Sequence, residues 1–267
     1  MSFCASKSWR IFLYAMKKLS VIICCYNEIA TIEGVIARTK AVELGDGWER
    51  EIIVVDNYST DGSRELLQQI NDPEIKVFYH DKNMGKGMSV RTGIAHMTGD
   101  YMLIQDADSE YDPAEHIRFC RKADETNAAA IFGSRVLGGQ AKYEYVHAYL
   151  GVRFLSTLNN LLFGGRLTDV LTGTKMVRYG VVAPLNLTCT SYDLDTELPD
   201  KILLSGHEIL EIPVSYDPRT YAEGKKITSK DGFRSIVVMV RDRLGLSPVF
   251  KKAVKGKVSA VREESAL

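Results

Sequence analysis

The sequence predicts an α/β protein with a mostly parallel sheet and helices on both faces of that sheet. Short β-branched segments alternate with helix-like segments between residues 19 and 135, and the strand-like segments are apolar throughout. Such strands are typical of a parallel sheet that helices cover on both sides. Polar residues follow most of these segments, and ligands of open α/β sheets bind beyond the carboxyl ends of the strands.

Each element of the first half has its own local pattern. Apolar Ile29, Ile32 and Val35 fall at helical spacing after the first strand, and Pro113 suits the first turn of a later helix. Five strands are predicted, at 19–27, 51–57, 75–80, 100–108 and 128–135. The helices between and after them are predicted at 28–42, 59–70, 85–97 and 113–125.

Two further helices are predicted after residue 140, at 143–165 and 233–244. The first has a side made of apolar residues, which indicates either core packing or a helix lying on a membrane surface. These residues are Leu150, Phe154, Leu158, Leu161 and Leu162.

We predict three parts along the chain. Residues 1–15 form an N-terminal extension, because Met16 begins "MKKLSVIICC" directly before the first strand. Residues 16–228 form the catalytic domain, and residues 229–267 form a C-terminal amphipathic helix and a basic tail.

Composition limits the partners of the protein. Lys plus Arg equals Asp plus Glu at 34 each, so no global field favours nucleic acid. No apolar run reaches ~18 residues, so we expect membrane contact to be peripheral. The five cysteines lack metal-type spacing and fit thiols in a reducing compartment.

The stretch "LIQDADSEYDP" places Asp106, Asp108 and Glu110 at alternate positions where an apolar strand ends. On an extended strand end, alternate side chains share a face, and crowded carboxylates call for a positive counter-charge. Mg²⁺ or Mn²⁺ would supply it, together with the phosphates of a substrate. The alternative is an acidic turn that stabilises the start of the following helix.

A series of motifs then carries a resemblance to a known family. They are "SVIICCYNE", "IIVVDNYSTDGS", "KNMGKGMSVRTGIAHMTGD", "DADSEYDP", "GSRVLGG", "TDVLTGTKMVR" and "RTYAEGKKIT". In this order they resemble family 2 glycosyltransferases of the GT-A fold, within the dolichyl- and polyprenyl-phosphate sugar synthase group. Cys24 and Cys25 replace a Pro-Thr-like pair of that family, and Asn57 and Tyr58 replace Asp-Asp or Asp-Gly.

The resemblance implies roles for residues at matching positions. For the nucleotide sugar they are Tyr26, Glu28 and Asp56 at the base and ribose, Lys86 and Arg91 in the segment that passes the diphosphate, and Asp106 as a further residue of the donor site. For Mg²⁺ or Mn²⁺ they are Asp106 and Asp108, with Glu110 as a third ligand. Two simpler roles stay open, a core aromatic for Tyr26 and a turn former for Asp56.

The acceptor implied by the resemblance is polyprenyl or dolichyl phosphate. Arg135 and Arg219 would hold its phosphate, with Arg153 placed less directly. A phosphate monoester is largely dianionic at neutral pH, so it needs cations and no general base. A hydroxyl of a glycan is the alternative acceptor, with Asp195 or Glu197 as base.

The sequence therefore predicts an inverting, metal-dependent hexosyltransferase. Asp108, Arg135 and Arg219 are its expected catalytic residues, and a GDP- or UDP-linked hexose of mannose or glucose type is its expected donor. We expect it on the cytoplasmic face of a membrane, with a membrane protein or a second copy as a partner. A nucleotide-binding protein without transferase activity is a third hypothesis.

Overall fold

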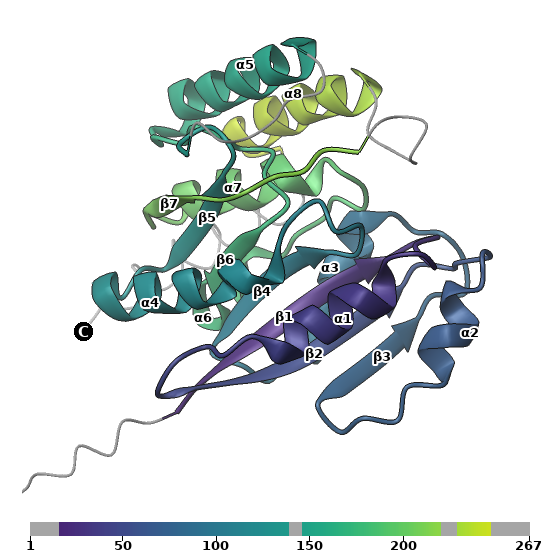
Figure 1. Cartoon of the computed structure of the whole chain (residues 1–267). Coiled ribbons are helices and arrows are strands. Elements are labelled where there is room, and N and C mark those ends of the chain that lie inside the picture. Colours follow the sequence, from purple (N-terminus) through teal and green to yellow (C-terminus); the bar gives the residue numbers. More distant parts are fainter. Residues whose placement is uncertain (1–15, 139–145, 220–228, 247–267) are drawn as a thin grey trace, which may run out of the picture.

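The computed structural model describes residues 16–138, 146–219 and 229–246 as a seven-stranded sheet with helices on both faces (Figure 1). The strand order is β3-β2-β1-β4-β6-β5-β7, and β6 alone among the described strands runs antiparallel to its neighbours. The strands are β1 (Lys17–Cys25), β2 (Trp48–Asp56), β3 (Ile75–Tyr79), β4 (Tyr101–Asp106), β5 (Ala130–Ser134), β6 (Lys175–Arg178) and β7 (Ile209–Pro213). The predicted GT-A type of fold is thereby confirmed.

The helices divide between two cores, one on each face of the sheet. Along β1, Val21 and Ile23 face the core under α1, α2 and α4, and Ile22 faces the core shared with α3, α5, α7 and α8. The α-helices are α1 (Ile32–Ala41), α2 (Ser63–Gln68), α3 (Lys86–His96), α4 (His116–Thr126), α5 (Val146–Phe163), α6 (Tyr179–Val182), α7 (Leu194–Leu204) and α8 (Ser229–Arg243). Two 3₁₀ turns are η1 (Pro113–Glu115) and η2 (Ala183–Leu185).

The register of the parallel strands gathers several polar strand ends at one edge of the sheet. Cys25 of β1 lies opposite Asp56 of β2, and Cys24 lies opposite Asp106 of β4. Side chains that are far apart in sequence therefore meet beyond these strand ends, as the alternation of elements predicted.

The prediction for the end of the fourth strand is wrong in one respect. β4 ends at Asp106, and the chain then turns, with Ser109 in the left-handed region at φ 64°. Asp108 accepts a hydrogen bond from the backbone N–H of Glu110 at 3.2 Å, as Asp side chains commonly do in turns. Asp108 and Glu110 are therefore not placed by strand alternation.

Helices α5 and α8 lie side by side at the end of the molecule farthest from β3 (Figure 1). Among the predicted apolar residues of α5, Leu150, Phe154 and Leu161 are exposed, whereas Leu158 and Leu162 pack against the core. Helix α8 exposes Phe233, Val237 and Val240 at helical spacing, and Leu244, directly after the helix, is exposed as well. Within the described part of the chain, no helix has the length and hydropathy needed to cross a bilayer.

The predicted N-terminal extension and the tail beyond residue 246 lie outside the described residues. The boundary proposed at residue 229 stays a prediction, although α8 packs on α7 and α5. The four described cysteines, Cys24, Cys25, Cys120 and Cys189, are free thiols.

Candidate active site

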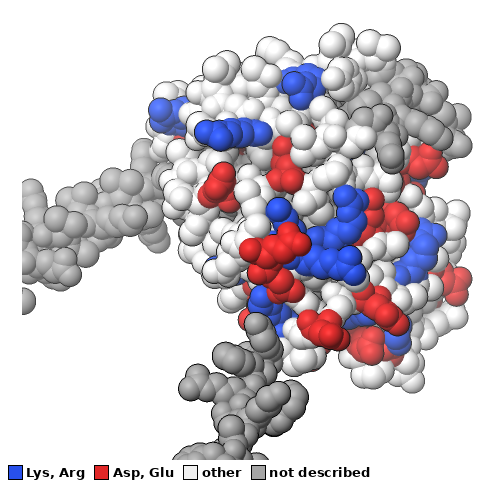
Figure 2. Space-filling view, turned by 60° about the vertical axis from the view of Figure 1, so that its left-hand side comes forward, with Lys and Arg blue, Asp and Glu red and all other residues white. Residues whose placement is uncertain are grey.

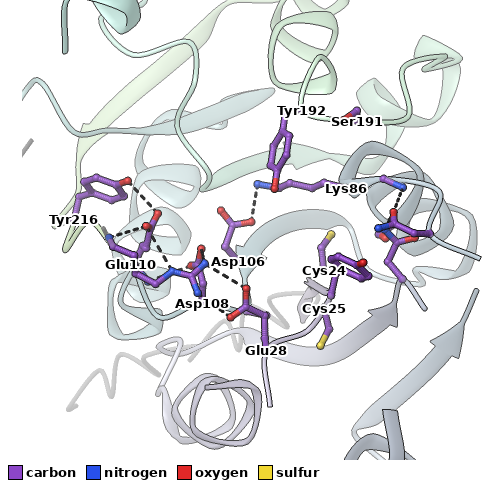
Figure 3. Close-up of a pocket in the computed structure, with 17 residues that line it drawn as sticks. Cys24, Cys25, Glu28, Lys86, Asp106, Asp108, Glu110, Ser191, Tyr192 and Tyr216 are labelled. Carbon is purple, nitrogen blue, oxygen red and sulfur yellow. Dashed lines mark hydrogen bonds and ion pairs between the residues drawn. The ribbon is translucent and has the colours of Figure 1, made fainter. Parts of the chain in front are cut away.

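A pocket of about 310 Å³ opens where β1 and β4 end, and it holds most of the predicted site residues (Figure 3). Seven of them line it: Tyr26, Glu28, Lys86, Asp106, Asp108, Glu110 and Arg219. The pocket brings together segments from both halves of the chain. Charges of both signs intermingle on the face shown in Figure 2, in keeping with a net charge of zero.

Lys86 enters the pocket from the first residue of α3 and forms an ion pair with Asp106 at 2.6 Å. Burial opposes the charged ammonium, but the carboxylates of Asp106 and Asp195 outweigh it and raise the pKa of Lys86. Gly85 has φ +88°, and a Cβ there would lie 2.3 Å from the carbonyl oxygen of Thr190. Glycine is therefore required for α3 to begin this close to the Thr190 segment.

Arg219 joins three of the acidic residues of the pocket. Its Nη1 lies 2.9 Å from Glu28 Oε2, and its Nη2 lies 2.7 Å from Asp108 Oδ2. Its Nε lies 3.8 Å from Glu110 Oε1, which also accepts the backbone N–H of Arg219 at 2.9 Å. The guanidinium thus supplies positive charge in the middle of the predicted metal ligands.

This counter-charge does not fully balance the acids. Burial and the neighbouring charges of Asp106 and Glu110 raise the pKa of Asp108 to about 7, although Arg219 lowers it. Among the described residues, no three Asp, Glu, His or Cys side chains form a group arranged to hold a metal ion. Lys86 pairs with Asp106, whereas Arg219 pairs with Asp108 and lies near Glu110.

Two residues predicted for the nucleotide sugar do not line the pocket. Asp56 is fully buried and pairs with Arg64 at 2.6 Å, and it also accepts the backbone N–H of Ser59. This contact fits the turn-forming alternative for Asp56. Arg91 lies further along α3 and donates to the carbonyl of Thr188 at 3.3 Å.

The predicted acceptor arginines other than Arg219 also lie outside the lining. Arg135 is nearly buried, and its Nε and Nη2 donate to the two oxygens of Asp169 at 2.6 and 2.7 Å. This bidentate geometry fixes the guanidinium. Arg153 is partly exposed on α5 and is not part of the pocket wall.

The two acids weighed as a general base are both engaged in buried ion pairs. Asp195 accepts from Lys175 at 2.8 Å, and Glu197 accepts from Lys201 at 2.7 Å. Neither lines the pocket. Every carboxylate among the described lining residues belongs to Glu28, Asp106, Asp108 or Glu110.

Sequence reasoning missed several contributors to the pocket, among them Ser191, Tyr192, Tyr216 and Gly173. The first three line it, and a Cβ at Gly173 would lie 2.3 Å from Asp106 Oδ2. Gly173 lies in "TDVLTGTKMVR", one of the motifs that carry the resemblance, and this motif was the signal that could have identified it. No local pattern distinguishes the two tyrosines from core aromatics.

Solved structures with a similar fold include two proteins in complex with UDP. Glucosyl-3-phosphoglycerate synthase from Mycobacterium tuberculosis, in complex with Mn²⁺, UDP and phosphoglyceric acid, is 19% identical with a TM-score of 0.62, over 85% of this chain and 78% of that chain. TarS 1–349 from S. aureus, in complex with UDP, is 16% identical with a TM-score of 0.59, over 84% and 65% of the two chains. These identities support the fold alone.

The family itself is established by sequence. A model of the family described as "Glycosyl transferase family 2" matches residues 20–185, which is more than half of the chain and includes the ends of β1, β2 and β4. The chain belongs to glycosyl transferase family 2.

Proposed function

We propose that this transferase moves a hexose of mannose or glucose type, with inversion, from a UDP- or GDP-hexose to polyprenyl or dolichyl phosphate. The observation that carries the proposal is the single pocket in which Asp106 and Asp108 lie beside the cations of Lys86 and Arg219. Such a pocket suits two anionic substrates that must approach each other.

A divalent ion, Mg²⁺ or Mn²⁺, is part of this proposal. The donor set fits such an ion, because Asp106 and Asp108 offer hard oxygen ligands, and the ion would take the place that Lys86 and Arg219 hold at these oxygens. Glu110 is the candidate third ligand. When bound, the ion would stabilise negative charge on a departing diphosphate, and a similar solved enzyme contains Mn²⁺ and UDP.

The chain's own residues would do the remaining work. Lys86, at the N-terminus of α3, would bind the diphosphate, where the helix dipole also favours an anion. Tyr26 and Glu28 would contact the nucleoside. Asp56 and Arg91 would support this region from outside the pocket wall, since neither side chain lines it.

The acceptor is proposed to be a phosphate monoester because both candidate bases are held in ion pairs. Asp195 and Glu197 are paired with lysines, whereas a phosphate dianion attacks without a base. Arg219 would orient that phosphate. Arg135, assigned to the same phosphate by resemblance, is engaged by Asp169.

The lipid part of the acceptor is supported by the exposed apolar side chains of α5 and α8. Basic Lys230, Arg234 and Arg243 accompany those of α8, as in helices that lie on anionic membrane surfaces. We therefore propose peripheral contact with the cytoplasmic face of a membrane, with a membrane protein or a second copy as a further partner.

A second candidate is transfer to a hydroxyl of a glycan or another soluble acceptor in cell-surface polysaccharide synthesis. It is favoured by the similar fold of the enzyme whose structure contains the soluble acceptor phosphoglyceric acid.

The test is to incubate the protein with Mn²⁺ and radiolabelled UDP- and GDP-hexoses, offering polyprenyl phosphate and soluble glycans in parallel. Label in an acid-labile lipid fraction is the expected result. Label on soluble glycans alone would refute the lipid acceptor and support the second candidate. An Asp108→Ala variant that is folded and inactive in both reactions would serve as the control for background transfer.

A further inference from the structure

Tyr216 is the pocket residue that connects the acidic turn after β4 with the buried arginine at the end of β5. It follows β7 and is 9% exposed. Its hydroxyl donates to Glu110 Oε2 at 3.0 Å, and the two side chains meet at one side of the pocket (Figure 3). Its ring centre lies 5.2 Å from that of Tyr111.

Arg135 contacts the ring of Tyr216. Its guanidinium carbon lies 5.0 Å from the centre of the Tyr216 ring, within the range of a cation–π contact. Asp169 holds that guanidinium by two side-chain hydrogen bonds, and the Asp169 backbone N–H in turn donates to Glu211 of β7 at 3.0 Å. Arg135 therefore presents a fixed cation to the ring.

Glu110 divides its carboxylate between two donors from the same segment. Oε2 accepts the Tyr216 hydroxyl, and Oε1 accepts the backbone N–H of Arg219. The Glu110 carbonyl also accepts the backbone N–H of Asp217 at 3.0 Å. These bonds fasten residues 216–219 to the turn after β4, and they set the point from which the Arg219 side chain reaches Asp108 and Glu28.

We propose that Tyr216 is a positioning residue that fixes Glu110, and through it Arg219, over the carboxylates of the pocket. Arg135 then affects transfer by holding the Tyr216 ring and not by touching the acceptor. The expected effect on turnover rests on the proposed function. The contacts of Tyr216 with Glu110 and Arg135 lie within the protein and do not depend on it.

Removing the hydroxyl group of Tyr216 tests its positioning role separately from the packing of its ring. Phenylalanine at this position keeps the ring contacts with Tyr111 and Arg135 and removes only the bond to Glu110. Tyr111 offers a matched control: it is a neighbouring buried tyrosine, and its hydroxyl accepts the backbone N–H of Gly173 instead of contacting Glu110.

The experiment compares Tyr216→Phe, Tyr111→Phe, Glu110→Gln and the Tyr216→Phe/Glu110→Gln double variant of the full chain. Hydrogen–deuterium exchange is measured on the peptide containing residues 216–219, without donor, metal or acceptor. We expect faster exchange of this peptide in Tyr216→Phe and Glu110→Gln, and exchange like that of the parent protein in Tyr111→Phe. Equal exchange in all variants would overturn the proposal.

Turnover gives the second readout. A hydrogen bond to a carboxylate supports a loss of about tenfold or more in kcat for Tyr216→Phe, with a smaller change in KM for the donor. The double variant should lose little more than Glu110→Gln alone, because glutamine leaves one uncharged oxygen for the two donors and so already weakens the bond that Tyr216→Phe removes. Additive losses would overturn the proposed coupling of the two residues.

The two proposals fail in different ways. Labelling of a soluble glycan alone would refute the lipid acceptor, while the exchange result at residues 216–219 would still test Tyr216. Unchanged exchange together with labelled polyprenyl phosphate would refute only the positioning role.

Discussion

The guanidinium of Arg219 lies 2.7 Å from Asp108 Oδ2 and 2.9 Å from Glu28 Oε2, so one side chain neutralises two acids that come from the ends of different strands. A divalent ion bound by Asp108 would compete with this guanidinium for the same oxygen. The pocket therefore holds a positive charge before any metal enters it.

The first prediction concerns this competition. Arg219→Gln should bind Mn²⁺ about tenfold more tightly than the parent protein when no nucleotide sugar is present, because a charge-assisted bond to Asp108 no longer has to be broken. Its transfer activity should fall. Isothermal titration with Mn²⁺ measures the affinity, and Arg118→Gln, which changes an exposed arginine of α4, is the control. An unchanged or weaker Mn²⁺ affinity would contradict the prediction.

The second prediction concerns metal dependence. Asp108→Asn should lower transfer by about a thousandfold or more, since it removes a ligand charge at the point where diphosphate charge develops. Chelation of divalent ions should inactivate the parent protein, and Mn²⁺ or Mg²⁺ should restore it. Asp124→Asn, a change in an exposed acid of α4, should leave activity unchanged. Full activity in chelator would refute the metal-dependent mechanism.

The third prediction concerns the apolar side chains of α5 and α8. Phe154 is 59% and Phe233 is 68% exposed, and burial of one such side chain in a lipid interface is worth roughly 1.5–3 kcal/mol. Phe154→Asp and Phe233→Asp should each weaken sedimentation with vesicles of phosphatidylglycerol and phosphatidylcholine by about tenfold or more. Tyr179→Asp provides the control, because Tyr179 is 47% exposed on α6. Equal losses in all three variants would argue against a specific membrane face.

The fourth prediction concerns pH and a buried acidic cluster between α7 and α8. Lys201 and Arg241 form ion pairs there with Glu197 and Asp242. Within the described part of the chain, Asp200 Oδ2 and Asp242 Oδ2 have no hydrogen-bond partner. Burial, followed by the charge of Asp242, raises the pKa of Asp200 well above its usual value. The folded protein therefore binds a proton at Asp200 more tightly than the unfolded chain does.

The sign of the pH effect follows from that difference. Between the unfolded pKa of Asp200, near 3.8, and its raised folded value, stability falls as pH rises; above the folded value the deficit is constant. Asp200→Asn should remove this slope and raise the free energy of unfolding at pH 8 by roughly 1 kcal/mol or more. Urea unfolding from pH 5 to pH 9 measures it, with Asp124→Asn as the control. A variant less stable than the parent at pH 8 would refute the assignment.

The sequence predicted the parts of the molecule that follow from local pattern and strand ends. Asp106 was singled out because it lies where an apolar strand ends, and Lys86 because of the family resemblance; both line the pocket. β6 was not foreseen as a strand: it is four residues long, runs antiparallel and lies between β4 and β5. Its place in the sheet depends on its partners more than on its own residues.

The contacts of the arginines could not be predicted for a similar reason. Arg219 meets Asp108 across a separation of 111 residues, and Arg135 meets Asp169 across 34. Contacts between residues this far apart leave no periodic pattern in the sequence. The resemblance assigned both arginines to the acceptor phosphate. In the structure Arg219 lines the pocket, whereas Arg135 packs against the ring of Tyr216.

The reversed direction of β6 has a consequence for engineering. The neighbouring strands end at the pocket edge of the sheet, whereas β6 begins there. The segment that leads into β6 therefore places Gly173 against Asp106, and the first residue of β6, Lys175, forms an ion pair with Asp195. A transplanted loop ahead of β6 would thus reshape the cavity while every strand that delivers a carboxylate stayed intact. Any such graft must retain glycine at position 173, since even a methyl group there would collide with Asp106.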